Sequence, residues 1–301
     1  MAESSGPERH ERPVIFRCAD ANLLGILHPA ETTADVLVIV VVGGHQYRIG
    51  SHRQFVQLAR ALARAGIPAM RFDHRGYGDS EGDLHRYWRI GADIAAAIEA
   101  GTAATGASRV VLWGLCDGAS AICFYAPDDP RVAGIVLANP WVRSEHTQSQ
   151  AYLRSYYPQR LKQLDFWRNL AAGRTDVRQA GRTLARIIQR RAGGGGIAAV
   201  SDRPEPDDAP PTDLPTAVMH DLSRFDGPAL VFLSDDDITA AEFHYAAATP
   251  PWRRRLRRKG QRLTTQTCEG ADHTFSRDGA KAQVEQGTIA WVRETFAAPS
   301  K

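Results

Sequence analysis

The chain has 301 residues, of which 43% are hydrophobic and 24% are charged, and its formal net charge at pH 7 is +3. This composition is typical of one large α/β domain or two modest ones, and the net charge is too small to indicate a nucleic-acid partner. No run approaches the ~18 to 20 consecutive apolar residues of a membrane span. The polar start, MAESSGPERHERP, resembles neither a signal peptide nor a transit peptide, so we expect a disordered tail over residues 1–12 and a cytoplasmic protein.

Strand-like runs alternate with amphipathic segments over residues 13–140, the first part of the expected core. Val36–Val42 is a continuous aliphatic run, typical of a strand buried on both faces of a parallel sheet. Strands are expected at 14–17, 23–28, 36–42, 67–72, 109–113 and 132–138, and helices from 55 to Gly66, at 90–101 and at 119–125. This order predicts a doubly wound, mostly parallel sheet.

The alternation stops after residue 140. Residues 141–226 contain no clear strand, and we interpret them as an inserted helical lid with a flexible, Gly-rich and Pro/Asp-rich segment at 193–215. Between Ala151 and Arg191 the lid carries ten basic residues against two acidic ones. The core resumes over 227–298, with strands at 228–233 and 263–268, a helix at 239–258 that breaks at Pro250-Pro251, and a closing helix at 280–296.

The stretch VVLWGLCDGASAICFY places Cys116 between a strand and a small-residue helix, the order expected of a nucleophile elbow. Gly114 and Gly118 permit the strained backbone and the close approach of strand and helix that an elbow requires. A thiolate would be favoured there by the helix dipole and by a neighbouring imidazolium. The alternative is a small apolar residue in a tight turn, which is how most buried cysteines serve.

The other three cysteines, Cys18, Cys123 and Cys268, are expected to be packing residues. The four cysteines include no CxxC pair and have no ligand-like spacing to histidines, which argues against a zinc site or a disulfide framework. We therefore expect no metal and no cofactor.

An acid and a histidine follow later strands in the order that the α/β-hydrolases use. Asp237 follows the 228–233 strand, and His273 follows the 263–268 strand. Carboxyl ends of parallel strands share one edge of a sheet, so both side chains can meet Cys116 there. Asp235 and Asp236 compete with Asp237 for the role of the acid, and spacing alone does not exclude Asp236. The expected fold is therefore an α/β-hydrolase with an inserted helical lid.

An oxyanion hole is expected between the elbow and the turn Gly43-Gly44-His45. The backbone N–H of Asp117 is one candidate donor, and an amide near His45 or Gln46 is the other, with Gly44 in the same wall. The glycine-rich stretch FDHRGYGDSEG at 72–82 follows the neighbouring strand, and we interpret it as a turn with no part in the chemistry.

Several segments together resemble one family, the α/β-hydrolases called exosortase A system-associated hydrolase 1, over about residues 13–297. The most specific are the cysteine elbow GLCDGAS, the segment SHRQF and the lid segment FWRNLAAG; the others are FDHRGYGDSEG, DDITAAEF and EGADHTFS. The resemblance implies a triad of Cys116, Asp237 and His273, and it prefers Asp237 because that residue precedes ITAAEF. The glycine run and the Pro/Asp-rich insert depart from the family pattern.

The expected function is acyl processing through an acyl-cysteine intermediate, with hydrolysis of an ester or thioester. Because a thioester also reacts with amines and thiols, transfer or cyclisation onto another acceptor is the alternative. A non-catalytic scaffold with the same fold is a third interpretation, against which the presence of all three triad residue types argues. The expected substrate is a small acyl ester or thioester, and the basic lid suggests that an acidic acyl carrier protein could present it.

Overall fold

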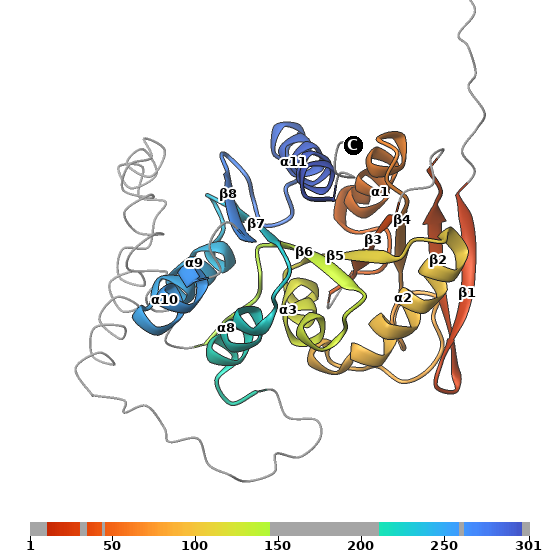
Figure 1. Cartoon of the computed structure of the whole chain (residues 1–301), viewed down its shortest axis with the longest axis horizontal. Coiled ribbons are helices and arrows are strands. Elements are labelled where there is room, and N and C mark those ends of the chain that lie inside the picture. Colours follow the sequence, from red (N-terminus) through yellow and green to blue (C-terminus); the bar gives the residue numbers. More distant parts are fainter. Residues whose placement is uncertain (1–10, 31–34, 44–45, 145–210, 259–261, 297–301) are drawn as a thin grey trace, which may run out of the picture.

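A computed structural model of the chain describes residues 11–30, 35–43, 46–144, 211–258 and 262–296. Its centre is one eight-stranded sheet with the order β1-β2-β4-β3-β5-β6-β7-β8 (Figure 1). The strands are β1 (Arg12–Cys18), β2 (Ala21–His28), β3 (Val36–Val41), β4 (Ala69–Phe72), β5 (Arg109–Leu115), β6 (Val132–Ala138), β7 (Ala229–Ser234) and β8 (Leu263–Cys268). β2 runs antiparallel to both β1 and β4, and the pairs from β4 to β8 are parallel. The predicted doubly wound, mostly parallel sheet is confirmed.

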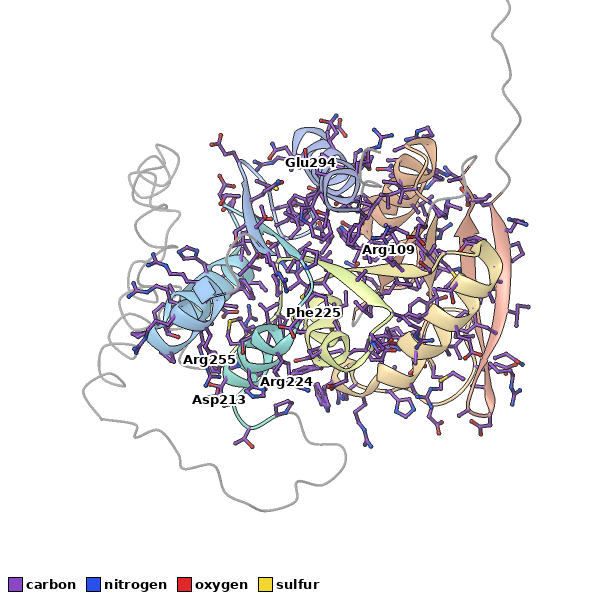
Figure 2. The ribbon with its side chains drawn as sticks, in the orientation of Figure 1. Arg109, Asp213, Arg224, Phe225, Arg255 and Glu294 are labelled. Carbon is purple, nitrogen blue, oxygen red and sulfur yellow. The ribbon has the colours of Figure 1, made fainter. Side chains whose placement is uncertain are left out.

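Helices cover both faces of this sheet. They are α1 (Gln54–Arg64), α2 (Gly91–Thr105), α3 (Asp117–Tyr125), α8 (Leu214–Arg224), α9 (Ile238–Ala248), α10 (Pro250–Arg258) and α11 (Asp278–Phe296). Short 3-10 helices span Ser51–Arg53, Tyr87–Arg89 and Ala126–Asp128. α1 and α11 lie on one face, and α2, α3 and α8 lie on the other, with side chains filling the space between the layers (Figures 1 and 2).

The central strands are hydrophobic on both faces because both faces are covered. All six residues of β3 are buried, and alternate residues enter opposite cores: Leu37, Ile39 and Val41 pack toward α2 and α3, whereas Val36, Val38 and Val40 pack toward α1. A strand buried on both sides has no polar face, which explains the uninterrupted aliphatic run in the sequence.

The predicted lid lies largely outside the described residues, which resume at 211. α8 falls within the range predicted for the lid, 141–226, yet its residues Val218, Met219 and Leu222 are buried in the core that contains α3. This helix therefore packs beside α3 and α9 in the body of the domain. Among the helices of the described ranges, none is both long enough and apolar enough to cross a membrane.

Candidate active site

Cys116 lies in the sharp turn between β5 and α3, with φ 58° and ψ −124°. Few residues other than glycine adopt this backbone conformation. It is strained, and it persists because the surrounding contacts hold the chain in place. The Cys116 N–H donates to the carbonyl oxygen of Ala138 at 2.9 Å. A Cβ on Gly114 would lie 2.7 Å from the backbone of Gly118, and one on Gly118 would lie 2.6 Å from the carbonyl oxygen of Val41. Only glycines fit these two positions, and together they produce the backbone of a nucleophile elbow.

Cys116 differs from the other cysteines in its exposure. Cys18, Cys123 and Cys268 are buried, whereas Cys116 is partly exposed at the carboxyl edge of the sheet. Burial raises the pKa of each of the three buried thiols, which disfavours their reactive thiolate forms. The structure therefore separates one accessible thiol from three packing residues.

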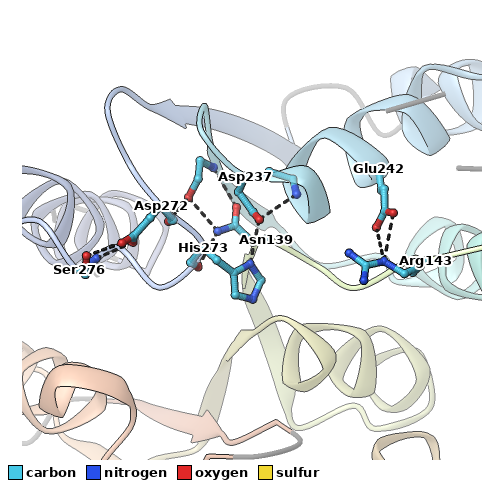
Figure 3. A network of polar contacts seen from close by, with 9 residues as sticks. Asn139, Arg143, Asp237, Glu242, Asp272, His273 and Ser276 are labelled. Carbon is cyan, nitrogen blue, oxygen red and sulfur yellow. Dashed lines mark hydrogen bonds and ion pairs between the residues drawn. The ribbon is translucent and has the colours of Figure 1, made fainter. Parts of the chain in front are cut away.

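Asp237 and His273 meet at the same edge, with Oδ2 of Asp237 2.8 Å from Nδ1 of His273 (Figure 3). The same carboxylate accepts from the backbone N–H of Ala240 at 3.1 Å and so begins α9. This N-terminal cap holds the carboxylate in one rotamer, because a short polar side chain in that position satisfies a helix donor. Asp237 thus orients the imidazole while being oriented itself by α9.

Burial lowers the pKa of His273, but hydrogen bonds to Asp237 and Cys116 and the charges of both groups outweigh it and raise the pKa to about 10. His273 therefore interacts with the side chains of both other predicted triad members. The structure brings Cys116, Asp237 and His273 together in the predicted order along the sheet edge.

The neighbouring aspartates are placed differently. Asp236 is exposed, and Asp235 accepts a hydrogen bond from the backbone N–H of Ala271 at 3.1 Å. The hydrogen bond of Asp235 is therefore with the backbone and not with the imidazole of His273. Of the three adjacent aspartates, Asp237 is the one that contacts His273.

The structure describes part of the predicted oxyanion wall. Asp117 begins α3, and its Oδ1 accepts from the N–H of Gly118 at 3.1 Å. Gly43 lies so close that a Cβ there would be 1.9 Å from that Oδ1, so the turn after β3 packs directly on the start of α3. The N–H of Gln46 donates to the carbonyl oxygen of Gly43 at 3.3 Å, and its side chain donates to Ser51. Gly44 and His45 lie outside the described residues.

The stretch 72–82 does more than form a turn. The buried carboxylate of Asp73 accepts from the N–H of Arg48 at 2.6 Å and pairs with its guanidinium, and it also accepts from the N–H of Asp79 at 3.2 Å. Arg48 belongs to the loop between β3 and α1, in which the oxyanion wall is predicted. Asp73 therefore anchors that loop, a role which the sequence alone did not indicate.

Asn139 is a further residue that sequence reasoning missed. It is fully buried directly after β6 with φ 42°, and its Nδ2 donates to Oγ of Ser234 at 2.8 Å and to the carbonyl oxygen of His273 at 2.9 Å (Figure 3). Its Oδ1 accepts from the N–H of Ser234 at 2.9 Å. Asn139 thus fixes the loop that carries His273 to the end of β7. Its position at the carboxyl end of a central strand is the sequence feature that could have identified it.

Within the ranges that the structure describes, no group of three or more His, Cys, Asp or Glu side chains could hold a metal ion.

A family model described as serine aminopeptidase, S33, matches residues 33–192, more than half of the chain. The chain belongs to this family. Its S33 membership places it among hydrolases named for a serine, whereas the residue at the elbow of this chain is Cys116. A comparison with curated protein sequences found no significant match.

Solved structures similar to this S33 family member are α/β-hydrolases. The Pyrococcus furiosus esterase Pf2001 has a TM-score of 0.62 at 12% identity, with 96% of this chain and 94% of that chain covered. Est1E from Butyrivibrio proteoclasticus, solved with ferulic acid, has a TM-score of 0.59 at 14% identity and coverages of 94% and 99%. XC6422 from Xanthomonas campestris, described as a serine hydrolase without lid, has a TM-score of 0.55 at 15% identity and coverages of 97% and 97%. These likenesses confirm the predicted α/β-hydrolase fold.

Proposed function

We propose that the protein cleaves an ester or thioester through an acyl-cysteine intermediate. The observation that carries this proposal is the joint placement of Cys116 in the strained elbow and of His273, which is paired with Asp237 and whose pKa Cys116 helps to raise. The resemblance of the elbow, of SHRQF and of the lid segment to exosortase A system-associated hydrolase 1 supports the use of cysteine within the family.

The proposed reaction has two steps. The sulfur of Cys116 attacks the carbonyl carbon, the bond to the leaving oxygen or sulfur breaks, and His273 gives that leaving atom a proton. Water then attacks the acyl-cysteine, His273 takes its proton, and the carbon–sulfur bond breaks to release the acid. Asp237 keeps the imidazole oriented in both steps. The raised pKa of His273 favours the imidazolium, the form that gives the leaving atom its proton.

The oxyanion that forms in each step is proposed to be bound by backbone N–H groups. Asp117 supplies one of them at the start of α3, where the helix dipole also favours negative charge. Gly44, His45 and Gln46 remain the candidates for the second donor. Since the N–H of Gln46 already donates to Gly43, the amides of Gly44 and His45 are preferred.

Acyl transfer is the second candidate function. An acyl-cysteine retains enough reactivity to acylate an amine, hydroxyl or thiol, so the choice between acceptors depends on what reaches it in place of water. The ten basic residues against two acidic ones between Ala151 and Arg191 support presentation of the acyl group by an acidic carrier protein. That segment lies outside the described residues.

The test is steady-state turnover of butyryl esters and butyryl thioesters by the wild type, Cys116→Ala and His273→Ala. Hydrolysis by the wild type and its loss in both variants is the expected result. Addition of an amine or thiol acceptor distinguishes transfer from hydrolysis by the product formed. No turnover of any acyl compound by a folded wild type would favour the scaffold interpretation, and unchanged turnover by Cys116→Ala would refute the nucleophile.

A further inference from the structure

Arg143 and Glu242 form an ion pair beside the proposed triad that acyl hydrolysis itself does not need. Nε of Arg143 donates to the two carboxylate oxygens of Glu242 at 3.2 and 3.3 Å. Glu242 is fully buried on α9, whereas 33% of the Arg143 side chain is exposed. Removing a carboxylate from water costs free energy. That Glu242 is nevertheless buried against an arginine that reaches solvent indicates that the orientation of this guanidinium matters.

Both residues of the ion pair lie on segments that start at the carboxyl edge of the sheet, where the proposed triad lies. The N–H of Trp141 donates to the carbonyl oxygen of Cys116 at 3.2 Å, so the chain that leads to Arg143 lies against the elbow. Glu242 follows Asp237 on α9, and the negative charge of Asp237 acts on it. Two residues span at most about 7 Å, so the backbone of Arg143 stays within that reach of Trp141, which lies against the elbow.

The guanidinium of Arg143 is held in one orientation. Its central carbon lies 4.3 Å from the centroid of the Trp141 ring, and Nε is held by Glu242. Within the described part of the chain its hydrogen bonds run through Nε alone, and Figure 3 shows the outer nitrogens pointing away from Glu242. Nη1 and Nη2 therefore present two parallel donors, which match the two oxygens of a carboxylate.

The electrostatic balance of the pair leaves positive charge available. Burial raises the pKa of Glu242 to about 7, with Asp237 adding to the rise and Arg143 opposing it. Near neutral pH a substantial fraction of Glu242 is therefore protonated, while Arg143 remains charged. An incoming anion would meet a cation that its partner only partly neutralises.

We propose that Arg143 binds a carboxylate at the far end of the acyl group, so that half-thioesters and half-esters of short dicarboxylic acids are the preferred substrates. This inference rests on the proposed acyl hydrolysis at Cys116 and adds the substrate class. Arg143 would act as a specificity-determining residue, and Glu242 as the residue that positions it.

The test compares N-acetylcysteamine thioesters, whose leaving group is neutral. The ratio of kcat/KM for succinyl, glutaryl or adipoyl thioesters to that for the butyryl thioester is measured in the wild type, Arg143→Gln and Arg143→Lys. A charge-assisted contact of this kind predicts that the ratio for the best anionic substrate falls roughly 10- to 100-fold in Arg143→Gln. Arg143→Lys should recover part of it, because it keeps the charge and loses the paired geometry.

Arg131→Gln is the matched control. Arg131 forms a similar ion pair with Asp129 at the opposite end of β6, and its loss should leave the ratio unchanged. Butyryl-coenzyme A provides a second arm, because its anionic group lies on the leaving side. If Arg143→Gln lowers turnover of the coenzyme A thioester and not the dicarboxylic ratio, the anion belongs to the leaving group and the proposal is wrong.

The remaining outcomes separate the two proposals. Turnover of the butyryl thioester with equal ratios in wild type and Arg143→Gln would overturn the substrate class and leave the hydrolysis intact. If no thioester is turned over, hydrolysis fails, and calorimetry with glutarate on the Cys116→Ala protein then decides. Binding that is lost in Cys116→Ala/Arg143→Gln would support the carboxylate site, and absent or equal binding would overturn it.

Discussion

Replacing Asp237 by Asn separates the chemical role of this side chain from its structural role. The carboxylate has two contacts, with Nδ1 of His273 at 2.8 Å and with the N–H of Ala240 at 3.1 Å. Asn begins a helix about as well as Asp, so the contact with Ala240 can survive the substitution. The negative charge that favours the imidazolium does not survive it.

The expected loss is large in rate and small in stability. Removal of the triad acid in this way lowers kcat on the order of 10⁴-fold, which corresponds to about 5 kcal/mol in the activation free energy. Asp237→Asn should melt close to the wild type. Asp237→Ala should lose the helix cap as well, at about 1 kcal/mol, or roughly 2 °C in Tm for a chain of this size.

The titration of His273 provides an independent readout. Its pKa of about 10 should fall toward the ordinary value near ~6.5 in Asp237→Asn, which NMR of the imidazole would detect. Because the pKa is raised in the folded state, the contribution of His273 to stability is complete below ~6.5 and is lost as the pH rises through about 10. The variant should therefore lose less stability than the wild type over that range.

The assay is kcat for a butyryl thioester, with thermal melts on the same preparations. Asp236→Asn is the control, since this neighbouring residue is exposed. Near-wild-type activity in Asp237→Asn, together with a severe loss in Asp236→Asn, would show that the acid is assigned one residue too late.

Three other substitutions probe the surroundings of the site. In the wild type the free energy of unfolding should fall by up to about 3 kcal/mol as the pH rises from about 4.5 to 7, because the raised pKa of Glu242 makes its ionisation unfavourable in the folded state. Glu242→Gln should reduce this fall in denaturant titrations at several pH values. An unchanged pH dependence would contradict the raised pKa of Glu242. Asn139→Ala should destabilise the fold by about 3 kcal/mol and lower kcat, since three hydrogen bonds that fix the His273 loop are lost; a wild-type Tm would refute this. Gly43→Ala should lower kcat with a smaller effect on KM, because its Cβ would lie 1.9 Å from Asp117 and displace the oxyanion wall; unchanged kinetics would contradict the close approach.

The sequence predicted those features that depend on local pattern. Strands such as β3 and β7 were readable because burial on both faces requires a continuous run of apolar residues. The meeting of Cys116, Asp237 and His273 was predictable because parallel strands share a carboxyl edge. Asp237 could not be separated from Asp236 by spacing, since the choice depends on which carboxylate the start of α9 turns toward the imidazole.

Contacts between distant segments left no local pattern to read. Asn139 and Ser234 are 95 positions apart, and Arg143 and Glu242 are 99 apart. Neither pair has a characteristic spacing, because each depends on how β6, β7 and α9 pack. The extent of the predicted lid was equally hard to read from the sequence, since α8 resembles any amphipathic helix until its partners in the core are known.

The central claim is that Cys116 carries the acyl group, and intact-mass analysis of the protein during turnover tests it most directly. After rapid mixing with a butyryl thioester and acid quenching, the wild type should gain the mass of one butyryl group, and peptide mapping should place it on Cys116. His273→Ala should accumulate less adduct, and Cys116→Ala none. An adduct on Cys18, Cys123 or Cys268, or turnover without any adduct in a protein that retains Cys116, would contradict the account.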